Sequence, residues 1–249
     1  MRIFFSLVSS EILKLRRTLA LWTIVLGPLA VVILQSSLWL NAKNGFGTDL
    51  DLWLTFTTNI LSMWSLFMYP LVCALVLALI YHYEHATAGW QKLYTLPVAK
   101  WKILASKIVG ALLLAFSSFI VLISISVIGA FIMDALHPNI EMPREIPIAA
   151  IAQRAFFVFV SMLLVFAIQN FVSWRWETLA VPIGVGIAGT FAALFASGWK
   201  YGYMFPWLMG IHALFQTPDK YEISLWGGFI GGVVILAATV LYSARRDIG

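Results

Sequence analysis

The sequence predicts an all-α polytopic membrane protein with six transmembrane helices. Of its 249 residues, 61% are hydrophobic and 11% are charged, whereas soluble domains are about 45–50% apolar and about 25% charged. Apolar runs near the roughly 20 residues of a spanning helix recur along the chain. They are unbroken rather than alternating, which excludes a β-barrel. The predicted spans are Leu19–Leu40, Ile60–Tyr81, Ile108–Met133, Ala149–Phe171, Leu179–Trp199 and Leu225–Tyr242.

Residues 1–18, ahead of the first span, have the pattern of an amphipathic helix. Apolar residues recur at helical spacing opposite polar ones, Phe4, Val8, Ile12 and Leu15 against Arg2, Ser9, Glu11 and Lys14. Such a helix lies in a membrane interface. We therefore expect it to rest on the bilayer surface.

The distribution of basic residues predicts the orientation. An even number of spans puts both termini on one side, and the other side receives only five of the sixteen lysines and arginines: Lys43, Arg144, Arg154, Lys200 and Lys220. Since basic residues accumulate on the cytoplasmic side, we expect a protein of the cytoplasmic membrane with both termini in the cytoplasm. Scattered bases of this kind do not indicate nucleic acid.

Residues 197–224, before the last span, are aromatic and apolar but interrupted by Gly202 and Pro206. Aromatic residues favour a membrane–water interface, so short re-entrant or interfacial helices are expected on the outer face. Tyr203 and Trp207 there could receive an amphipathic substrate or simply anchor the loop. The pattern leaves both interpretations open.

The interiors of the predicted spans contain few polar side chains. Asn59, Gln169 and Asn170 could line a substrate path, although such groups more often hydrogen-bond a neighbouring helix. Charged residues are absent from the span centres, which disfavours an ion-coupled transporter or an intramembrane hydrolase. We predict no catalytic residues.

Two glycine patterns lie inside spans. Gly184-x-Gly186-x-x-Gly189 matches a dinucleotide fingerprint, but that motif must follow a strand. Close helix packing explains it better, and we predict the same role for the last span's glycines, Gly227, Gly228, Gly231 and Gly232. The P-loop motif G-x-x-x-x-G-K-[ST] does not occur, so ATP is not bound through one on this chain.

Metal and redox chemistry have little support. His82 and His85 lie three residues apart, but a metal site needs further ligands, and none is near in the sequence. Cys73 is the single cysteine and lies within an apolar span, where it reads as a packing residue. We predict neither a metal site nor an intrachain disulfide.

Residues 82–107 are the long polar segment between two apolar spans. Trp90, Leu93 and Tyr94 form a short apolar helical face, Leu96–Pro97 interrupts it, and a helical face resumes toward the third span. This face could dock in the groove of a cytosolic partner or rest on the bilayer interface. The residues alone do not decide between the two.

The same segment resembles the cytoplasmic coupling stretch of the ABC-2 type transporter permeases. The matching positions are Glu84, Gly89, Leu93, Leu96, Pro97, Lys100 and Lys107, although many members have Gly-Thr near Gly89 and Arg at position 100. The six spans, the interfacial helix and the broken segment before the last span also fit, so residues 1–249 are expected to form one ABC-2 transmembrane domain. Size and tryptophan content resemble lantibiotic-immunity permeases.

The resemblance implies the permease subunit of an ATP-driven exporter of an amphipathic molecule or membrane-active peptide. A separate ATP-binding subunit would carry ATP and Mg²⁺, this chain would carry no cofactor, and a second permease subunit, identical or related, would complete the path. The residues expected to couple to the ATPase are Glu84, Gly89, Trp90, Leu93, Tyr94, Leu96, Pro97 and Lys100. The alternative is a membrane sensor or scaffold that recruits another cytosolic protein.

Overall fold

The computed structural model describes residues 2–15, 18–41, 51–87, 89–95, 97–136 and 142–245, which form helices and connecting turns without a strand. The long elements, in chain order, are α1 (Arg2–Leu15), α2 (Leu19–Leu40), α3 (Leu52–Met63), the π-helical η1 (Trp64–Met68), α4 (Tyr69–Ala86), α6 (Lys100–Leu136), α7 (Ile148–Ser161), α8 (Leu163–Arg175), α9 (Ala180–Ala196) and α11 (Tyr221–Arg245). The short ones are α5 (Gly89–Tyr94), η2 (Gly202–Met204), η3 (Pro206–Leu208) and α10 (Met209–Leu214).

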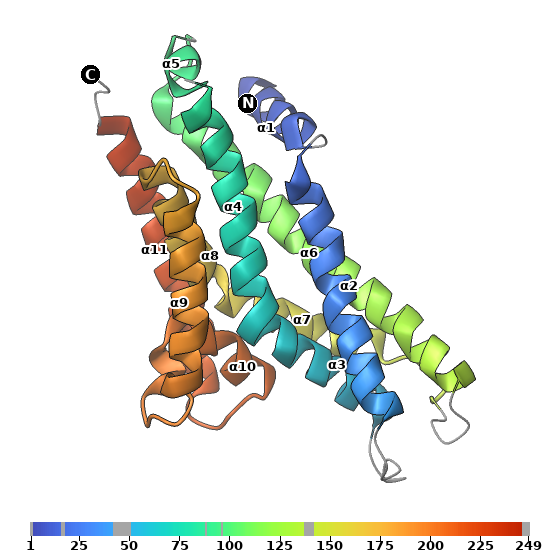
Figure 1. Cartoon of the computed structure of the whole chain (residues 1–249). Coiled ribbons are helices and arrows are strands. Elements are labelled where there is room, and N and C mark those ends of the chain that lie inside the picture. Colours follow the sequence, from blue (N-terminus) through green and yellow to red (C-terminus); the bar gives the residue numbers. More distant parts are fainter. Residues whose placement is uncertain are drawn as a thin grey trace.

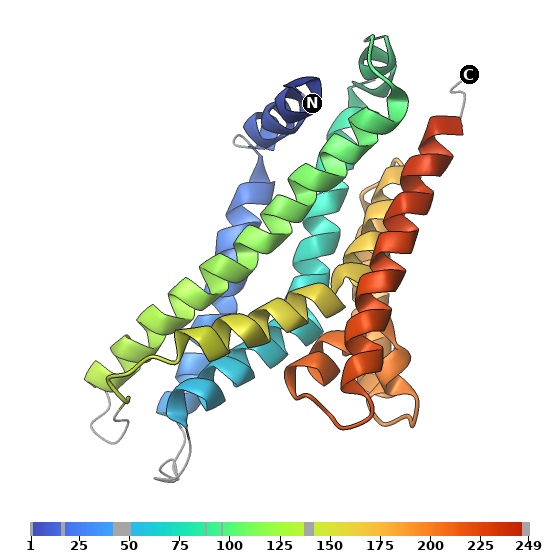
Figure 2. The ribbon, with the colours of Figure 1, turned by 180° about the vertical axis from the view of Figure 1, so that it is seen from behind.

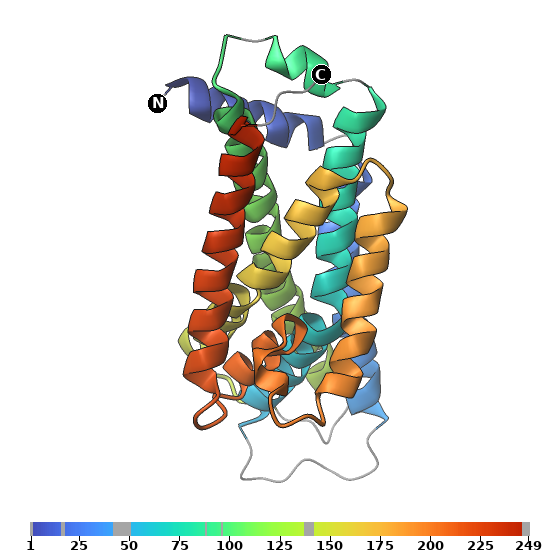
Figure 3. The same ribbon diagram turned by 90° about the vertical axis from the view of Figure 1, so that its left-hand side faces the viewer.

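The long helices form a bundle with two unlike ends (Figure 1). Helices α1 and α5 lie across one end, together with the start of α6 and the end of α11 (Figure 3); we call this the terminal end. The opposite or distal end holds α10 and the oblique helices α3 and α7 (Figure 2). Helix α1 and the last turns of α11 thus lie at the same end of the bundle (Figure 3).

The described helices support a membrane-spanning protein. Four are long and apolar enough to cross a bilayer, Leu19–Leu40, Leu52–Ala86, Lys100–Leu136 and Tyr221–Ala244, and a fifth span exists if α7 and α8 count as one. Helix α9 is apolar but has 17 residues, fewer than the roughly 20 that cross a hydrocarbon core directly. The predicted number of six spans therefore stays a prediction, as does the interfacial position of α1.

The second predicted span is longer than expected and contains a π-helical turn. Helix begins at Leu52 rather than near Ile60, and η1 lies immediately before Pro70. Proline has no amide hydrogen, and its ring clashes with the carbonyl four residues earlier in a regular helix. A π-helical turn accommodates that conflict and changes the helix direction, so α3 is oblique while α4 runs along the bundle (Figure 2).

The predicted fourth span, Ala149–Phe171, is broken into two helices. Helices α7 and α8 meet at Met162 with a bend of 42°, although neither glycine nor proline is present there. Helix α11 packs closely at this point: a Cβ on Gly228 would stand 2.1 Å from the Ser161 carbonyl oxygen, and one on Gly232 would stand 2.8 Å from the Leu163 carbonyl carbon. The backbone of α11 thus packs directly against the bend.

The segment before α11 folds inward. It contains η2, η3 and α10, and the side chains of Trp207, Leu208 and Leu214 are buried. A Cβ on Gly189 of α9 would come within 2.3 Å of the Trp207 ring, so that glycine makes room for the indole. Trp207 is therefore a packing residue of the distal end rather than an exposed interfacial anchor.

Candidate functional site at the terminal end

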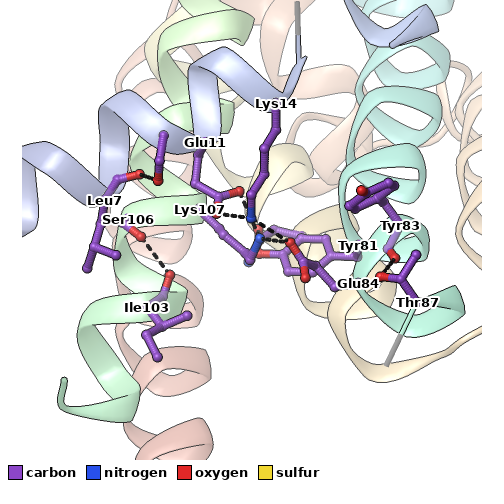
Figure 4. Close-up of polar contacts among 12 residues, drawn as sticks. Leu7, Glu11, Lys14, Tyr81, Tyr83, Glu84, Thr87, Ile103, Ser106 and Lys107 are labelled. Carbon is purple, nitrogen blue, oxygen red and sulfur yellow. Dashed lines mark hydrogen bonds and ion pairs between the residues drawn. The ribbon is translucent and has the colours of Figure 1, made fainter. Parts of the chain in front are cut away.

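Four charged side chains meet where α1, α4 and α6 converge (Figure 4). The Lys107 ammonium lies 2.7 Å from Glu84 Oε1 and 2.8 Å from Glu11 Oε2. The Lys14 ammonium lies 3.1 Å from Glu84 Oε1 and 3.1 Å from Glu11 Oε1. We call these four residues the ion-pair node; its two acids and two bases balance in charge.

The node is buried although its members are charged. Lys107 is 1% exposed and Glu84 is 3% exposed, whereas the Lys14 side chain is 41% exposed and forms the open edge. Removing charges from water is costly unless each finds an opposite charge, and breaking a buried pair costs roughly 3–5 kcal/mol. The three helices are thereby held in one arrangement.

Local helix geometry brings the four groups together. Glu11 and Lys14 are three residues apart on α1 and so share a face. Glu84 lies in the last turn of α4, and Lys107 lies in the second turn of α6. For Lys14, partial burial favours the neutral amine, but Glu11 and Glu84 outweigh burial and raise its pKa above the ordinary value.

The short helix α5 rests on this node. Its Trp90 indole stacks on Tyr81 of α4, with ring centroids 6.1 Å apart and planes 16° apart. The Lys107 ammonium lies 5.8 Å from the Trp90 ring centroid, within reach of a cation–π contact. Glycine at position 89 makes room for the Glu84 carboxylate, because a Cβ there would stand 2.0 Å from Glu84 Oε2.

Burial divides the predicted coupling residues into two groups. Glu84, Gly89 and Trp90 face inward, so Trp90 holds α5 in place and does not belong to an exposed docking face. Leu93 is half-buried against the core, Lys100 is partly buried and Pro97 is exposed. Leu96 and the side chain of Tyr94 lie outside the described residues.

An exposed surface remains beside α5. Gln91 and Lys92 point outward from it, and Trp101 in the first turn of α6 is 46% exposed. The Lys102 ammonium lies 5.6 Å from the Trp101 ring centroid. We call Gln91, Lys92 and Trp101 the exposed coupling surface; the sequence analysis did not single it out.

Two of the proposed substrate-path residues lie inside helix contacts. Asn170 accepts a hydrogen bond from the Tyr81 hydroxyl at 2.8 Å and joins α8 to α4. The Gln169 side-chain nitrogen donates a hydrogen bond to the Pro182 carbonyl oxygen at 3.1 Å, and its side-chain oxygen accepts one from the Gly186 backbone amide at 3.0 Å. Both act as polar contacts between helices.

The other path candidates differ in position. Asn59 on α3 and Tyr203 in η2 are half-buried at the distal end. The Tyr203 carbonyl oxygen accepts a hydrogen bond from the Ser224 hydroxyl at 3.1 Å. Asn59, Tyr203 and the buried Trp207 therefore do not form a single site together with Gln169 and Asn170.

The glycines predicted to pack helices surround the bend at Met162. Besides the backbone contacts of Gly228 and Gly232, a Cβ on Gly231 would stand 3.2 Å from Leu164 Cδ1, and one on Gly227 would stand 3.4 Å from Met209 Cε. Gly186 of α9 similarly faces Ala74 of α4, 2.7 Å from an added Cβ. Gly184 faces open space.

The sequence analysis missed Glu11 and Lys14 as site residues. It treated them as the polar face of α1 and used Lys107 only for orientation and resemblance. The available signal was the presence of two acids and two bases near the expected ends of three neighbouring helices. Within the described ranges, no group of three or more His, Cys, Asp or Glu residues is arranged to hold a metal ion.

Comparison with known proteins identifies the family. The sequence profile described as an ABC-2 family transporter protein matches residues 7–193, which include most of α1, the node, α5 and most of α9. Neither a curated protein nor a solved structure gives a match.

Proposed function

The chain belongs to the ABC-2 family of transporter proteins, and from that premise we propose that it is the membrane-spanning permease subunit of an ATP-driven exporter. A permease of this family is a transport component and not itself a catalyst. The observation that carries the proposal is α5 seated on the ion-pair node, because an element that receives force must be tied firmly to the helices it moves.

A separate ATP-binding subunit would dock on the exposed coupling surface. Gln91 and Lys92 are polar and Trp101 offers a large apolar contact, a combination typical of interface anchors. The partner would supply ATP and Mg²⁺. The terminal end, which carries α1 and α5, would then face the cytoplasm, in agreement with the distribution of lysines and arginines.

Nucleotide binding would bias the permease between two conformations. Force on α5 passes through Trp90 and the node to α1, α4 and α6 together. Helix α4 then transmits this force to η1, where the helix direction changes. The bend at Met162 is a second position at which the helices would rearrange. A second permease subunit, identical or related, would complete the path between the two copies.

The proposed cargo is an amphipathic molecule, such as a membrane-active peptide. Support comes from the resemblance to lantibiotic-immunity permeases and from exposed aromatic side chains at the distal end, such as Trp199 and Tyr201. Of the path candidates, Asn59 and Tyr203 retain partial exposure, so we propose these two as the residues that meet the cargo.

The test is affinity capture of the tagged chain from native membranes, followed by mass spectrometry and an ATP hydrolysis assay. We expect a P-loop ATPase to co-purify with the wild-type chain. A Lys92→Glu/Trp101→Ala variant should lose most of that ATPase, because both side chains are exposed and the fold does not need them.

A matched control is Trp176→Ala, which removes another exposed tryptophan, directly after α8 and next to Glu177, whose carbonyl oxygen lies 3.1 Å from His82 Nδ1 of α4. It should retain the ATPase. Capture without any P-loop ATPase, or with another class of cytosolic protein, would contradict the proposal and favour a sensor or scaffold.

A further inference from the structure

Arg154 is a cation in an apolar part of the distal end. It lies on α7, is partly buried, and donates a hydrogen bond from its guanidinium to the Thr58 hydroxyl of α3. Helix α7 runs obliquely at the distal end (Figure 2). Charged residues on apolar helices are costly to place and usually mark a functional contact.

Arg154 lacks the compensation that Lys107 has. Within the described ranges, no carboxylate lies within 4.0 Å of its guanidinium. Asp51 on the neighbouring helix already accepts from the Leu54 amide at 3.1 Å as the cap of α3. The chain from Ile146 to Trp174, which includes nearly all of α7 and α8, contains no acid.

The remaining donors suit an anion with several oxygens. A guanidinium carries five N–H donors in a planar fork that matches phosphate, and Thr58 takes only one contact. The Thr58 oxygen accepts that bond, so its own hydrogen can be donated to a second oxygen.

We propose that Arg154 and Thr58 form a binding site for a phosphate group at the distal end. The phosphate can belong to a phospholipid headgroup or be free inorganic phosphate, since both present the same oxygens. The site does not depend on the proposed ATPase or on the direction of transport, so it can be tested on the permease alone.

The experiment uses the full chain, delipidated in neutral detergent, and measures Kd by the rise in thermal unfolding midpoint. The probes are a short-chain phosphatidylglycerol and inorganic phosphate, titrated separately. Arg154→Gln should weaken binding at least about tenfold, because a charge-assisted contact is lost. Arg144→Gln, which removes an exposed arginine just before α7, should bind like the wild type.

Stabilisation by phosphatidylglycerol alone would assign the site to a lipid headgroup, and equal stabilisation by inorganic phosphate would assign it to the free anion. Either result supports the site only if the Arg154→Gln variant loses that stabilisation. Binding that Arg154→Gln retains, or no binding by the wild type, overturns the proposal.

Thr58→Val keeps the shape of the side chain and serves if Arg154→Gln does not fold. It should weaken binding roughly tenfold to a hundredfold, since it loses a hydrogen bond to a charged group. Unchanged affinity in this variant would also overturn the proposal.

Discussion

The terminal and distal ends of this permease are stabilised by different kinds of interaction. At the terminal end, three helices converge on buried ion pairs, and α5 is stacked on them. At the distal end, helices change direction at η1 and Met162, and glycines allow close backbone contact. The described salt bridges all belong to the terminal end.

The difference has a mechanical consequence. Buried opposite charges tolerate little separation, because each one left unpaired carries its full desolvation cost. Helix bends and small-residue contacts offer alternative packings at lower cost. We therefore expect the terminal end to move as one body and the distal end to rearrange.

The largest effect should come from removing the centre of the node. Lys107→Met leaves Glu84 and Glu11 buried with only the partly exposed Lys14 between them, so the free energy of unfolding should fall by roughly 3–5 kcal/mol. Thermal unfolding in detergent measures it. Adding Glu84→Gln should recover part of the loss, since it removes one unpaired charge.

Lys14→Met is the matched control for the node, because Lys14 lies at its open edge. Its effect should stay within about 1 kcal/mol, as for exposed ion pairs. Equal losses for Lys14→Met and Lys107→Met would show that burial does not distinguish the two lysines.

A smaller effect should come from the distal packing. Gly228→Ala places a methyl group against the Ser161 carbonyl and should destabilise the protein by roughly 1–3 kcal/mol, as overpacking does. Gly184→Ala faces open space and should be neutral or slightly stabilising. If both variants unfold at the same temperature, the contact between α11 and the bend is not a constraint.

The smallest effect concerns pH. Burial, helped by Lys220, lowers the pKa of His212 in α10 below its ordinary value, so the unfolded chain binds a proton more readily than the folded one. Stability should therefore be highest above about pH 6.5 and decline as the pH falls below it. A pH series of unfolding midpoints measures the slope, and His212→Gln should reduce it.

The sequence predicted local features better than contacts between distant segments. The first span, Leu19–Leu40, has the predicted bounds, because a continuous apolar run determines them. The bend at Met162 escaped prediction, since residues 148–175 contain neither glycine nor proline and the helix packed against the bend, α11, is distant in the sequence. The π-helical turn at Trp64–Met68, close before Pro70, was also missed.

The candidate site was predicted in part for the same reason. The resemblance identified Glu84, Gly89 and the neighbouring segment, but helical spacing could not tell which side of α5 faces inward. Trp90 was expected to dock on a partner and instead packs on Tyr81 and Lys107. Glu11 and Lys107 are far apart in the sequence, so only folding reveals their contact.

The most direct test of the account is a pair of spin-label distances in the complex of permease and ATPase, measured with and without ATP. Labels at the exposed positions Ser10 on α1 and Gln91 on α5 report on the terminal end, and labels at Ile148 and Ser197 report on the distal end. The account predicts an unchanged 10–91 distance and a shifted 148–197 distance on ATP binding. A changed 10–91 distance, or an unchanged 148–197 distance, would contradict it.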